Sequence, residues 1–345
     1  MQNKKKIIVG MSGGIDSSVT AYLLQKEGYE VEGIYMKLHE TVPGYHEQNI
    51  ESIDKVSKFL DIKYTVLDVT KKFEEEVYEY FVQSYIDGIT PNPCVKCNRM
   101  IKFGALYDAA MDIGADYLAT GHYAKTDGEF IYCADDLSKD QSYFLAQIDR
   151  KVLPKIIFPM STYTKDEIKK IGTSLPALKD IASKKESQEI CFVENTYMDI
   201  LKEHTKIDMP GVTLDKDGNE VGHHKGYMHY TVGKRKGFYV HGAHEPHYVI
   251  SQDKENNTIT VGKKEDLAIY DVVVDNLNMF IDDKEFTCNV KLRFRSYTVS
   301  CKVNIIDNKA YIKLDDAILG VATGQVAVFY DKDKVIGSGW IIDTI

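Results

Sequence analysis

Apolar and polar positions in the first half of the chain form short strand-like runs that alternate with longer stretches of helical spacing. The strand-like runs cover 6–9, 31–36, 63–69 and 117–120, and the helical stretches cover 17–28, 50–60, 72–86 and 102–113. Such alternation is typical of a parallel sheet with helices on both faces. Ligands of these sheets bind beyond the carboxyl ends of the strands. The first half is therefore predicted to be an α/β domain whose site lies at that edge.

The pattern changes near residue 210, where glycine, histidine, tyrosine and β-branched residues become frequent. Six short runs of alternating character then follow, at 272–276, 287–294, 299–306, 310–314, 327–330 and 335–340. So many short strands in a small span predict an antiparallel β-barrel at the C-terminus. We expect domains at 1–205, 206–265 and 266–345, the middle one small and of mixed structure.

A glycine-rich loop joins the first strand-like run to the first helix. It reads Gly10-Met11-Ser12-Gly13-Gly14-Ile15-Asp16-Ser17-Ser18. Adjacent glycines expose backbone N–H groups, serines add hydroxyl donors and the helix N-terminus adds partial positive charge, so the loop is a candidate phosphate or pyrophosphate site. It lacks the Gly-Lys-Ser/Thr ending of a P-loop and the glycine spacing of dinucleotide folds. Met36 and Gly121-His122 also lie at the carboxyl ends of expected strands. Three unrelated loops would not be expected to share this location.

Composition narrows the class of protein. The chain has 345 residues, 43% of them hydrophobic, which is enough for two or three domains with their own cores. Lys4-Lys5-Lys6 leads into a short strand, and no apolar run approaches membrane-spanning length, so we expect a cytoplasmic protein without a signal peptide or membrane partner. Six cysteines in a chain of this size are expected to be reduced thiols. A net charge of −9 argues against indiscriminate binding of DNA or RNA, although a local basic patch can still bind RNA.

Two cysteines lie close together in Pro91-Asn92-Pro93-Cys94-Val95-Lys96-Cys97. Two prolines in three residues predict an extended, irregular loop that holds a thiol in place. A Cys-x-x-Cys pair is compatible with half a zinc site, a redox pair or part of an iron–sulfur cluster. No second pair follows at zinc-site spacing, which disfavours structural zinc. Cys133, Cys288 and Cys301 lie singly in strand-like runs and are expected to be buried apolar residues.

Several ordered motifs resemble those of the tRNA-specific 2-thiouridylases, a family of ATP pyrophosphatases. They are the glycine-rich loop, Thr-Pro-Asn-Pro-x-x-x-Cys-Asn with Ile-Lys-Phe at 90–103, Thr-Gly-His-Tyr-Ala at 120–124, Lys-Asp-Gln-Ser-Tyr-Phe-Leu at 139–145, Ser-x-Glu-Ile-Cys-Phe at 187–192, Tyr-Thr-Val-Gly-Lys-Arg-Lys-Gly at 230–237 and Gly-Gln-Val-Ala-Val-Phe-Tyr at 324–330. The resemblance runs from residue 6 to the end of the chain. It implies an adenine-nucleotide hydrolase-like parallel sheet domain, a small central domain and a C-terminal β-barrel.

The resemblance also implies a reaction. ATP adenylates the C2 oxygen of the wobble uridine in tRNAs for lysine, glutamine and glutamate, and a cysteine persulfide then delivers sulfur to C2. By position, Cys191 carries the persulfide and Cys97 is the nucleophile. Mg²⁺ is expected on the phosphates, with Asp16 as the nearest ligand or organiser. A persulfide sulfur-carrier protein or a cysteine desulfurase is the expected donor, and tRNA the expected substrate.

The site residues fall into two sets. ATP binding is assigned to Gly10, Met11, Ser12, Gly13, Gly14, Ile15, Asp16, Ser17, Met36 and Gly121. Contacts with tRNA are assigned to Asn92, Pro93, Cys94, His122, Lys139, Asp140, Gln141, Lys234, Arg235, Arg293, Arg295, Ser296 and Gln325. No residue set is assigned firmly to a metal.

Local sequence gives partial support to these roles. Lys96 and Lys102 are near enough in sequence to favour a thiolate at Cys97. The stretch 225–236 mixes four cations with aromatic rings, which suits RNA backbone and unpaired bases. Arg293 and Arg295 alternate along an expected strand and so share one face, where they either clamp phosphates or pair with nearby aspartates.

The chain departs from the family pattern at Cys94, where an aspartate is common, and in a shorter segment after Met36. Cys94 has three roles open to it: an acid or base, a thiol that helps resolve a disulfide, or one ligand of an iron–sulfur cluster with Cys97 and Cys191. Two other functions use some of the same features. A synthetase that adenylates a carboxylate has the same loop but no use for two thiols, and a tRNA-binding protein with vestigial residues would not need an intact loop.

Overall fold

The computed structural model describes residues 4–183 and 190–345 of the chain. Within them the chain divides into two compact units. The first comprises 4–77, 94–183, 190–194 and 333–335, and the second comprises 78–93, 195–332 and 336–345. The expected domain boundaries stay predictions. No helix within the described ranges has both the length and the apolar character needed to cross a bilayer.

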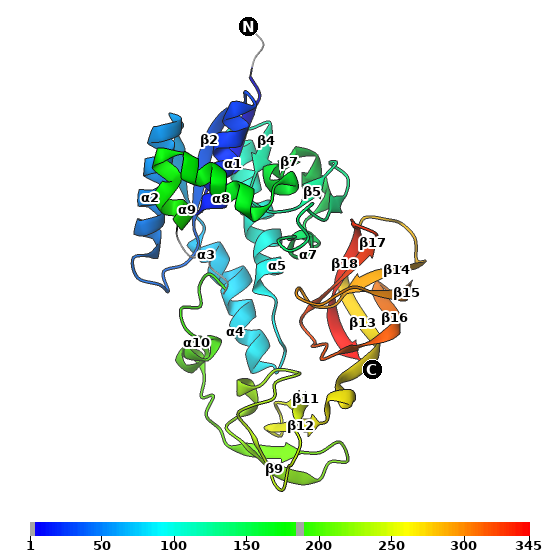
Figure 1. The fold of residues 1–345 in the computed structure, drawn as a ribbon. Coiled ribbons are helices and arrows are strands. Elements are labelled where there is room, and N and C mark those ends of the chain that lie inside the picture. Colours follow the sequence, from blue (N-terminus) through cyan, green and yellow to red (C-terminus); the bar gives the residue numbers. More distant parts are fainter. Residues whose placement is uncertain (1–3, 184–189) are drawn as a thin grey trace. The chain divides into compact units, whose positions relative to one another are not determined.

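A parallel five-stranded sheet organises the first unit (Figure 1). Its strands are β1 (Lys6–Gly10), β2 (Glu30–Lys37), β3 (Tyr64–Asp68), β4 (Tyr117–Ala119) and β7 (Ile156–Ile157), in the order β3-β2-β1-β4-β7. All four pairings are parallel, as the alternation of strand and helix predicts. Strand order reverses at β1, which lies between β2 and β4. Ligands bind at such a switch point, beyond the carboxyl ends of the strands.

Helices cover both faces of this sheet. Ile7 and Val9 are fully buried in a core that also takes side chains from α1 (Ile15–Lys26), α2 (Tyr45–Leu60) and α8 (Lys165–Ser174). Because successive strand residues point to opposite faces, Ile8 faces the other side, where α6 (Leu106–Asp112) contacts β2 and β4. Burying one such aliphatic side chain contributes about 1.5–3 kcal/mol, so both layers stabilise the sheet.

The remaining elements of the first unit are short. They are α3 (Thr70–Phe73), η1 (Glu74–Tyr78), α5 (Pro93–Cys97), η2 (Asn98–Ala105), β5 (Lys125–Thr126), β6 (Ile131–Tyr132), α7 (Ser142–Leu145), η3 (Arg150–Lys155), η4 (Pro159–Thr162), η5 (Pro176–Leu178) and α9 (Lys179–Ser183). The expected helix at 72–86 is divided, because a π-helical turn, η1, separates α3 from α4 (Glu79–Ile86).

The expectation of an irregular loop around Cys94 and Cys97 is wrong. Both residues lie in α5, which continues into the π-helical turn η2. Pro93 is the first residue of that helix, where a proline loses no hydrogen bond and already has a helical φ angle. Pro91 therefore precedes the helix and Pro93 begins it. Neither proline lies in the helix interior, where it would break the helix.

The second unit contains a mixed sheet next in sequence to α10 (Tyr197–His204). Its strands are β8 (Gly211–Leu214), β9 (Glu220–His224), β10 (Tyr239–Val240), β11 (Tyr248–Asp253) and β12 (Thr258–Gly262), in the order β10-β9-β8-β12-β11. Two short 3-10 turns, η6 (Tyr227–His229) and η7 (Lys264–Leu267), complete this part.

Six antiparallel strands close into the expected C-terminal barrel (Figure 1). They are β13 (Ala268–Met279), β14 (Glu285–Lys291), β15 (Val299–Ile306), β16 (Lys309–Leu319), β17 (Val326–Asp331) and β18 (Lys334–Thr344), and β13 pairs with β18 to close the ring. Closure leaves no unpaired barrel edge. In β15 buried and exposed residues alternate without a break. Asp307 and Asn308 both have positive φ angles in the two-residue turn to β16, as a type I′ hairpin requires.

Candidate functional site

The loop after β1 is held in shape by glycine and by its own hydroxyls. Gly13 has a φ of +78°, and a Cβ there would lie 2.9 Å from the backbone oxygen of Asn49, so a larger residue does not fit. The Ser17 and Ser18 hydroxyls lie 3.1 and 2.9 Å from the Gly14 carbonyl and donate to it. Both are buried, whereas Ser12 is exposed. Ser12 is therefore the loop hydroxyl that faces solvent at the N-terminus of α1.

Gly121 lies against this loop. It follows β4, the neighbour of β1, and a Cβ on it would lie 3.0 Å from the backbone of Asp16 and Ser17. Met36 lies one residue before the end of β2, the other neighbour of β1. The order of the strands thus brings the predicted nucleotide residues of three loops or strand ends to the same edge of the sheet.

Asp16 has two partners that the sequence did not single out. The ammonium of Lys165 donates to both carboxylate oxygens at 2.7 Å, and the Tyr123 hydroxyl donates to Oδ1 at 2.8 Å. Lys165 is only 7% exposed and is the first residue of α8, which begins with a capping box formed by Thr164 and Glu167. Tyr123 belongs to the Thr-Gly-His-Tyr-Ala motif, so the sequence could have identified it as a site residue. No sequence motif includes Lys165.

This arrangement bears on the expected magnesium ion. Both oxygens of Asp16 already accept hydrogen bonds from a buried cation. Within the described residues, no group of three His, Cys, Asp or Glu side chains is placed to hold a metal ion. Mg²⁺ bound with a nucleotide takes most of its ligands from phosphates and water and needs only one or two carboxylates. The site therefore fits a magnesium ion carried mainly by the phosphates and offers no preformed metal cage.

Three thiols share one environment in the first unit. Cys94 and Cys97 are three residues apart in α5, and Cys191 is close enough to both, and to Lys102, for their charges to act on it. Cys97 is buried, whereas Cys94 and Cys191 reach solvent with protein packed around them. Burial raises the pKa of Cys97 to about 11 and that of Cys191 to about 12, and it also raises the pKa of Cys94. Lys102 acts in the opposite direction on all three pKa values, but burial is the larger effect.

The two lysines expected to favour a thiolate differ in their effect on the pKa of Cys97. Lys102 does lower the pKa of Cys97, as expected. Lys96 forms an ion pair with Glu76 at 3.5 Å and is not among the groups that shift the pKa of that thiol. The net effect of the surroundings is to keep Cys97 protonated, because no cation compensates fully for the loss of water.

His122 connects the thiols to the nucleotide loop. Its Nε2 lies 3.3 Å from the Lys102 ammonium, and its Nδ1 lies 2.8 Å from the Thr120 hydroxyl. An ammonium can only donate, so Nε2 accepts and the proton of the neutral ring is on Nδ1. Burial and the Lys102 charge lower the pKa of His122 well below its usual value, which keeps the ring neutral. A chain of interactions therefore runs from the thiols, through the charge of Lys102 and its contact with His122, to Gly121 and Asp16.

Asp140 and Gln141, two of the expected tRNA contacts, bond within the chain. Asp140 is buried and accepts from the Ser142 hydroxyl at 2.7 Å and from the Ala134 N–H at 3.0 Å. The Gln141 side-chain oxygen accepts from the Tyr123 N–H at 3.0 Å. Because Tyr123 in turn holds Asp16, Gln141 supports the nucleotide loop. Lys139, beside them, is half-buried.

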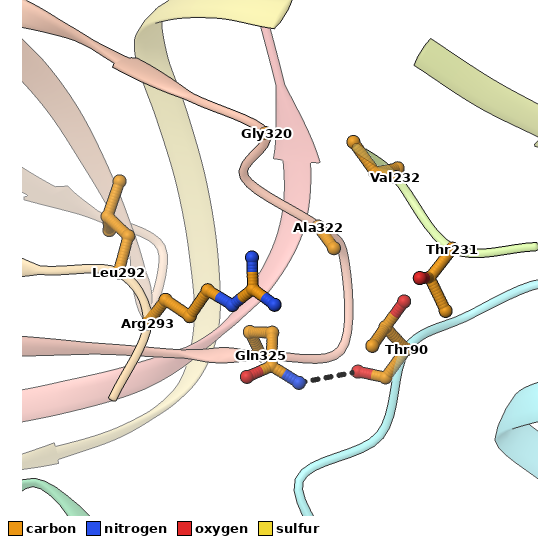
Figure 2. A pocket seen from close by; sticks show the side chains of 8 residues that line it. All are labelled: Thr90, Thr231, Val232, Leu292, Arg293, Gly320, Ala322 and Gln325. Carbon is orange, nitrogen blue, oxygen red and sulfur yellow. Dashed lines mark hydrogen bonds between the residues drawn. The ribbon is translucent and has the colours of Figure 1, made fainter. Parts of the chain in front are cut away.

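In the second unit a small cavity of about 120 Å³ brings together other predicted residues (Figure 2). It is lined by Thr90, Thr231, Val232, Leu292, Arg293, Gly320, Ala322 and Gln325. The Gln325 amide donates to the carbonyls of Thr90 and Pro91 at 3.1 and 3.0 Å. It thereby fixes the segment that contains Asn92, which is buried, and Pro93. Figure 2 shows the guanidinium of Arg293 beside this amide.

The expectation that Arg293 and Arg295 alternate along a strand is wrong. Strand β14 ends at Lys291, and both arginines lie in the following turn, where Ser296 donates through its N–H and its hydroxyl to the Arg293 carbonyl. Both arginines are exposed. No ion pair joins them to Asp282 or Asp283 in the described part of the chain.

The predicted cations of the middle segment separate into two kinds. Lys234 donates to the His229 carbonyl at 2.6 Å and lies over the Tyr230 ring, and burial lowers its pKa. Arg235 and Lys236 are exposed. Lys234 therefore stabilises the fold locally, and the two following residues present charge to solvent.

Of the three remaining cysteines, Cys301 is buried as expected, while Cys133 and Cys288 are half-buried. Cys288 faces Cys301 across β14 and β15, with 3.6 Å between their sulfur atoms. Ser187 and Glu189 of the motif before Cys191 lie outside the described residues. A cluster on Cys94, Cys97 and Cys191 stays a prediction.

Sequence models of three domain families match successive parts of the chain. They are described as the tRNA methyl transferase HUP domain, at residues 5–195, the tRNA methyl transferase PRC-barrel domain, at 198–263, and the aminomethyltransferase beta-barrel domain, at 271–341. Fold and matches together define a HUP-type α/β enzyme with two appended β domains.

Curated relatives make the family more specific. The chain is 61% identical over 343 residues to tRNA-specific 2-thiouridylase MnmA 1 of Aliarcobacter butzleri (strain RM4018), covering 99% of each chain. It is 53% identical to tRNA-specific 2-thiouridylase MnmA of Sulfurimonas denitrificans (strain ATCC 33889 / DSM 1251), covering 98% of this chain and 99% of that one. The chain belongs to the tRNA-specific 2-thiouridylase family of enzymes.

A more distant likeness is to a solved structure, the U34-tRNA thiolase NcsA from Methanococcus maripaludis with its [4Fe-4S] cluster. The TM-score is 0.37 at 22% identity, covering 59% of this chain and 66% of that one.

Proposed function

We propose that this enzyme uses ATP to replace the C2 oxygen of the wobble uridine with sulfur in tRNAs for lysine, glutamine and glutamate. The observation that carries the proposal is the chain of interactions from the thiols to the loop after β1. Cys191 and Cys97 interact with Lys102, Lys102 contacts His122, and Gly121 abuts Asp16. Adenylation takes place on the C2 oxygen and sulfur transfer on the carbon atom bonded to it, so the groups that serve the two steps need to share one site.

In the first step the uridine C2 oxygen attacks the α-phosphate, and pyrophosphate leaves. Backbone N–H groups of the loop, the exposed Ser12 hydroxyl and the N-terminus of α1 stabilise the charge on the departing group. Lys165 and Tyr123 fix the Asp16 carboxylate beside this position. Magnesium, when bound, neutralises phosphate charge.

In the second step the terminal sulfur of a Cys191 persulfide bonds to C2, and AMP leaves with the former C2 oxygen. The Cys97 thiol, which its surroundings keep protonated, then loses its proton to solvent with the Lys102 charge favouring the thiolate, and its sulfur attacks the inner sulfur of Cys191. A Cys97–Cys191 disulfide forms, the electron pair of the broken S–S bond stays on the sulfur now at C2, and a thiol reductant restores the cysteines. The persulfide itself comes from a sulfur-carrier protein or a cysteine desulfurase.

The proposal is tested by separating the two steps. Cys97→Ser and Cys191→Ser are expected to release pyrophosphate from the adenylation step while forming no 2-thiouridine, and Cys133→Ser serves as the thiol control with full activity. Nucleoside mass spectrometry of tRNA and a pyrophosphate assay give the two readouts. Full thiolation by Cys97→Ser would show that Cys97 is not the nucleophile. Adenylation of a carboxylate in place of tRNA would identify a synthetase instead.

The same preparations decide the part played by Cys94. If Cys97 is the nucleophile, Cys94→Ser lowers activity partly and Cys94→Asp is tolerated. If the three cysteines hold an iron–sulfur cluster, loss of any one removes both an iron-dependent absorbance and activity. Full activity in an iron-free preparation excludes the cluster.

A further inference from the structure

A buried cluster of rings follows β2 and lies outside the site described above. It consists of His39, Tyr45 and His46 with Phe73 and Phe192, and we call it the ring cluster. The His39 ring stacks on Tyr45 at a centroid distance of 5.1 Å and an angle of 29°, and it meets Phe192 edge-on at 6.4 Å. Phe73 contacts Phe192 at 5.5 Å. Phe192 is the residue after Cys191, so the ring cluster packs on the side chain next to the predicted persulfide carrier.

Polar contacts tie His39 to the same segment. The Thr41 hydroxyl lies 2.9 Å from Nδ1 of His39 and donates to the Phe192 carbonyl at 3.4 Å. Nε2 of His39 is buried without a partner at full hydrogen-bond geometry in the described structure. The Cys191 backbone lies close to the ring and raises the His39 pKa, the direction expected of a carbonyl acceptor. Two residues of the 39–41 segment thus contact two consecutive residues of the 191–192 segment.

The cluster is itself held in place from β2. His46 hydrogen-bonds through Nε2 to the His39 carbonyl and through Nδ1 to the Tyr35 hydroxyl. His39 and His46 are 6% and 8% exposed. Burial, followed by the neighbouring His46, lowers the pKa of His39 to about 4. The ring is neutral at physiological pH and has one N–H. Because the Thr41 hydroxyl donates to the Phe192 carbonyl, that N–H is on Nδ1 and donates to the Thr41 hydroxyl, while Nε2 faces the Cys191 backbone without a proton.

We propose that His39 is a positioning residue for sulfur transfer, which with Thr41 holds the main chain at Cys191 and Phe192 so that the Cys191 sulfur faces Cys97 and Lys102. This inference rests on the proposed function. Residue Cys191 reaches solvent although protein is packed around its sulfur, and the three groups whose charges act on that sulfur, Cys94, Cys97 and Lys102, lie on another segment, α5 and η2. A surface segment that carries a reactive sulfur needs a fixed anchor, because a misplacement of about 1 Å lowers the rate of a reaction on the order of 100-fold.

Matched substitutions distinguish the packing of the His39 ring from the hydrogen bonding of its nitrogens. His39→Phe keeps the stack on Tyr45 and removes both nitrogens, whereas His39→Asn keeps a polar group near the position of Nδ1. Thr41→Val removes the hydroxyl that links His39 to Phe192, and Thr41→Ser retains it. We expect His39→Phe and Thr41→Val to slow single-turnover sulfur transfer from a persulfide donor by about 10- to 100-fold. His39→Asn and Thr41→Ser recover most of that loss, and pyrophosphate release stays within about twofold of the unsubstituted enzyme.

A second readout does not depend on thiolation. Oxidised glutathione is added to each full-length protein, and the rate of the Cys97–Cys191 disulfide is followed by peptide mass spectrometry. His39→Phe and Thr41→Val are expected to slow this disulfide about tenfold or more, with thermal unfolding used to confirm that each variant is folded. Unchanged sulfur transfer and disulfide rates in these two variants overturn the proposal, as does an equal loss of pyrophosphate release. If the disulfide slows but the unsubstituted enzyme makes no 2-thiouridine, the positioning role stands and the proposed function fails.

Discussion

At the scale of single residues, the pairing of Asp16 with Lys165 changes how the loop after β1 is understood. The Asp16 carboxylate, predicted to be a magnesium ligand or organiser, accepts two hydrogen bonds from a buried ammonium. An Asp–Lys pair of this kind fixes the carboxylate and brings a cation next to the place where phosphate charge collects. Lys165 therefore belongs with the residues that hold this loop in place, although it lies 149 positions from Asp16 in the sequence.

Removing that cation tests its role. Lys165→Met is expected to lower ATP-to-AMP turnover about 100-fold, because Asp16 loses its charged partner and the site loses positive charge. When Lys165→Met is combined with Asp16→Asn, the total effect should be smaller than the sum of the two single effects, since residues in contact are coupled by about 0.5–3 kcal/mol. Lys170→Met, an exposed lysine of the same helix, is the control. Strict additivity in the double variant argues against the pair.

The thiol pKa values lead to a pH prediction. With pKa values of about 11 and 12, Cys97 and Cys191 are almost fully protonated at pH 8, so iodoacetamide should modify them far more slowly than a free cysteine. Their modification rates should rise about tenfold per pH unit up to pH 10. Lys102→Met removes a charge that lowers both pKa values and should slow the reaction further. A plateau near pH 8.5, measured by peptide mass spectrometry, contradicts the prediction.

At the scale of elements, two local rules decide how the site is assembled. Pro93 begins α5 and so places Cys94 and Cys97 on a helix, three residues apart. The order of β2, β1 and β4 places their carboxyl ends side by side, so that Gly121 packs directly on the start of α1. The close approach requires glycine, because a Cβ would meet backbone atoms that have no room to move.

Gly121→Ala tests this packing. The added methyl lies 3.0 Å from the backbone of Asp16 and Ser17, so it should displace the start of α1 and weaken ATP binding about tenfold. Gly28→Ala is the matched control, because Gly28 has a φ of +93° with open space around it. That variant should lose about 1 kcal/mol of unfolding free energy and keep its affinity for ATP. Calorimetric titration with ATP measures both, and equal affinities in the two variants contradict the packing argument.

At the scale of the whole molecule, a net charge of −9 makes the location of exposed cations important for binding an acidic partner. Lys234 forms internal contacts, whereas Arg235 and Lys236 are exposed after it. In an acidic protein, a few exposed cations of this kind determine where a polyanion such as tRNA can approach.

The charge reversal Arg235→Glu with Lys236→Glu is expected to weaken tRNA binding and to lower the slope of log affinity against log salt by about 2, because each cation that neutralises a phosphate accounts for roughly one unit of that slope. Lys309→Glu with Lys313→Glu makes the same change of charge on exposed positions of β16. Fluorescence titration at several salt concentrations compares the two. If both reversals change the slope equally, the effect is one of net charge, and the first pair is not a binding surface.

Much of the fold could be predicted because it depends on local pattern. Strand and helix periods predicted the parallel sheet, and short alternating runs predicted the barrel. The two errors in secondary structure concern the ends of elements, which the hydrophobic pattern does not determine. Pro93 lies at a helix start, where proline is tolerated, and the strand expected to end at residue 294 ends three residues early, at Lys291, where the chain turns. Neither outcome is determined by composition.

The sequence by itself determined the classes of element, the glycine loop before α1 and the thiols proposed to carry the chemistry, because turns, helix starts and side-chain types are local properties. Only the tertiary structure decided which distant groups meet. Lys165 reaches Asp16 across 149 positions, and Thr41 reaches Phe192 across 151. These contacts depend on the order of the parallel strands and on the helices packed against them. Likewise the thiol pKa values follow from the amount of protein around each sulfur, which no neighbouring residue in the sequence specifies.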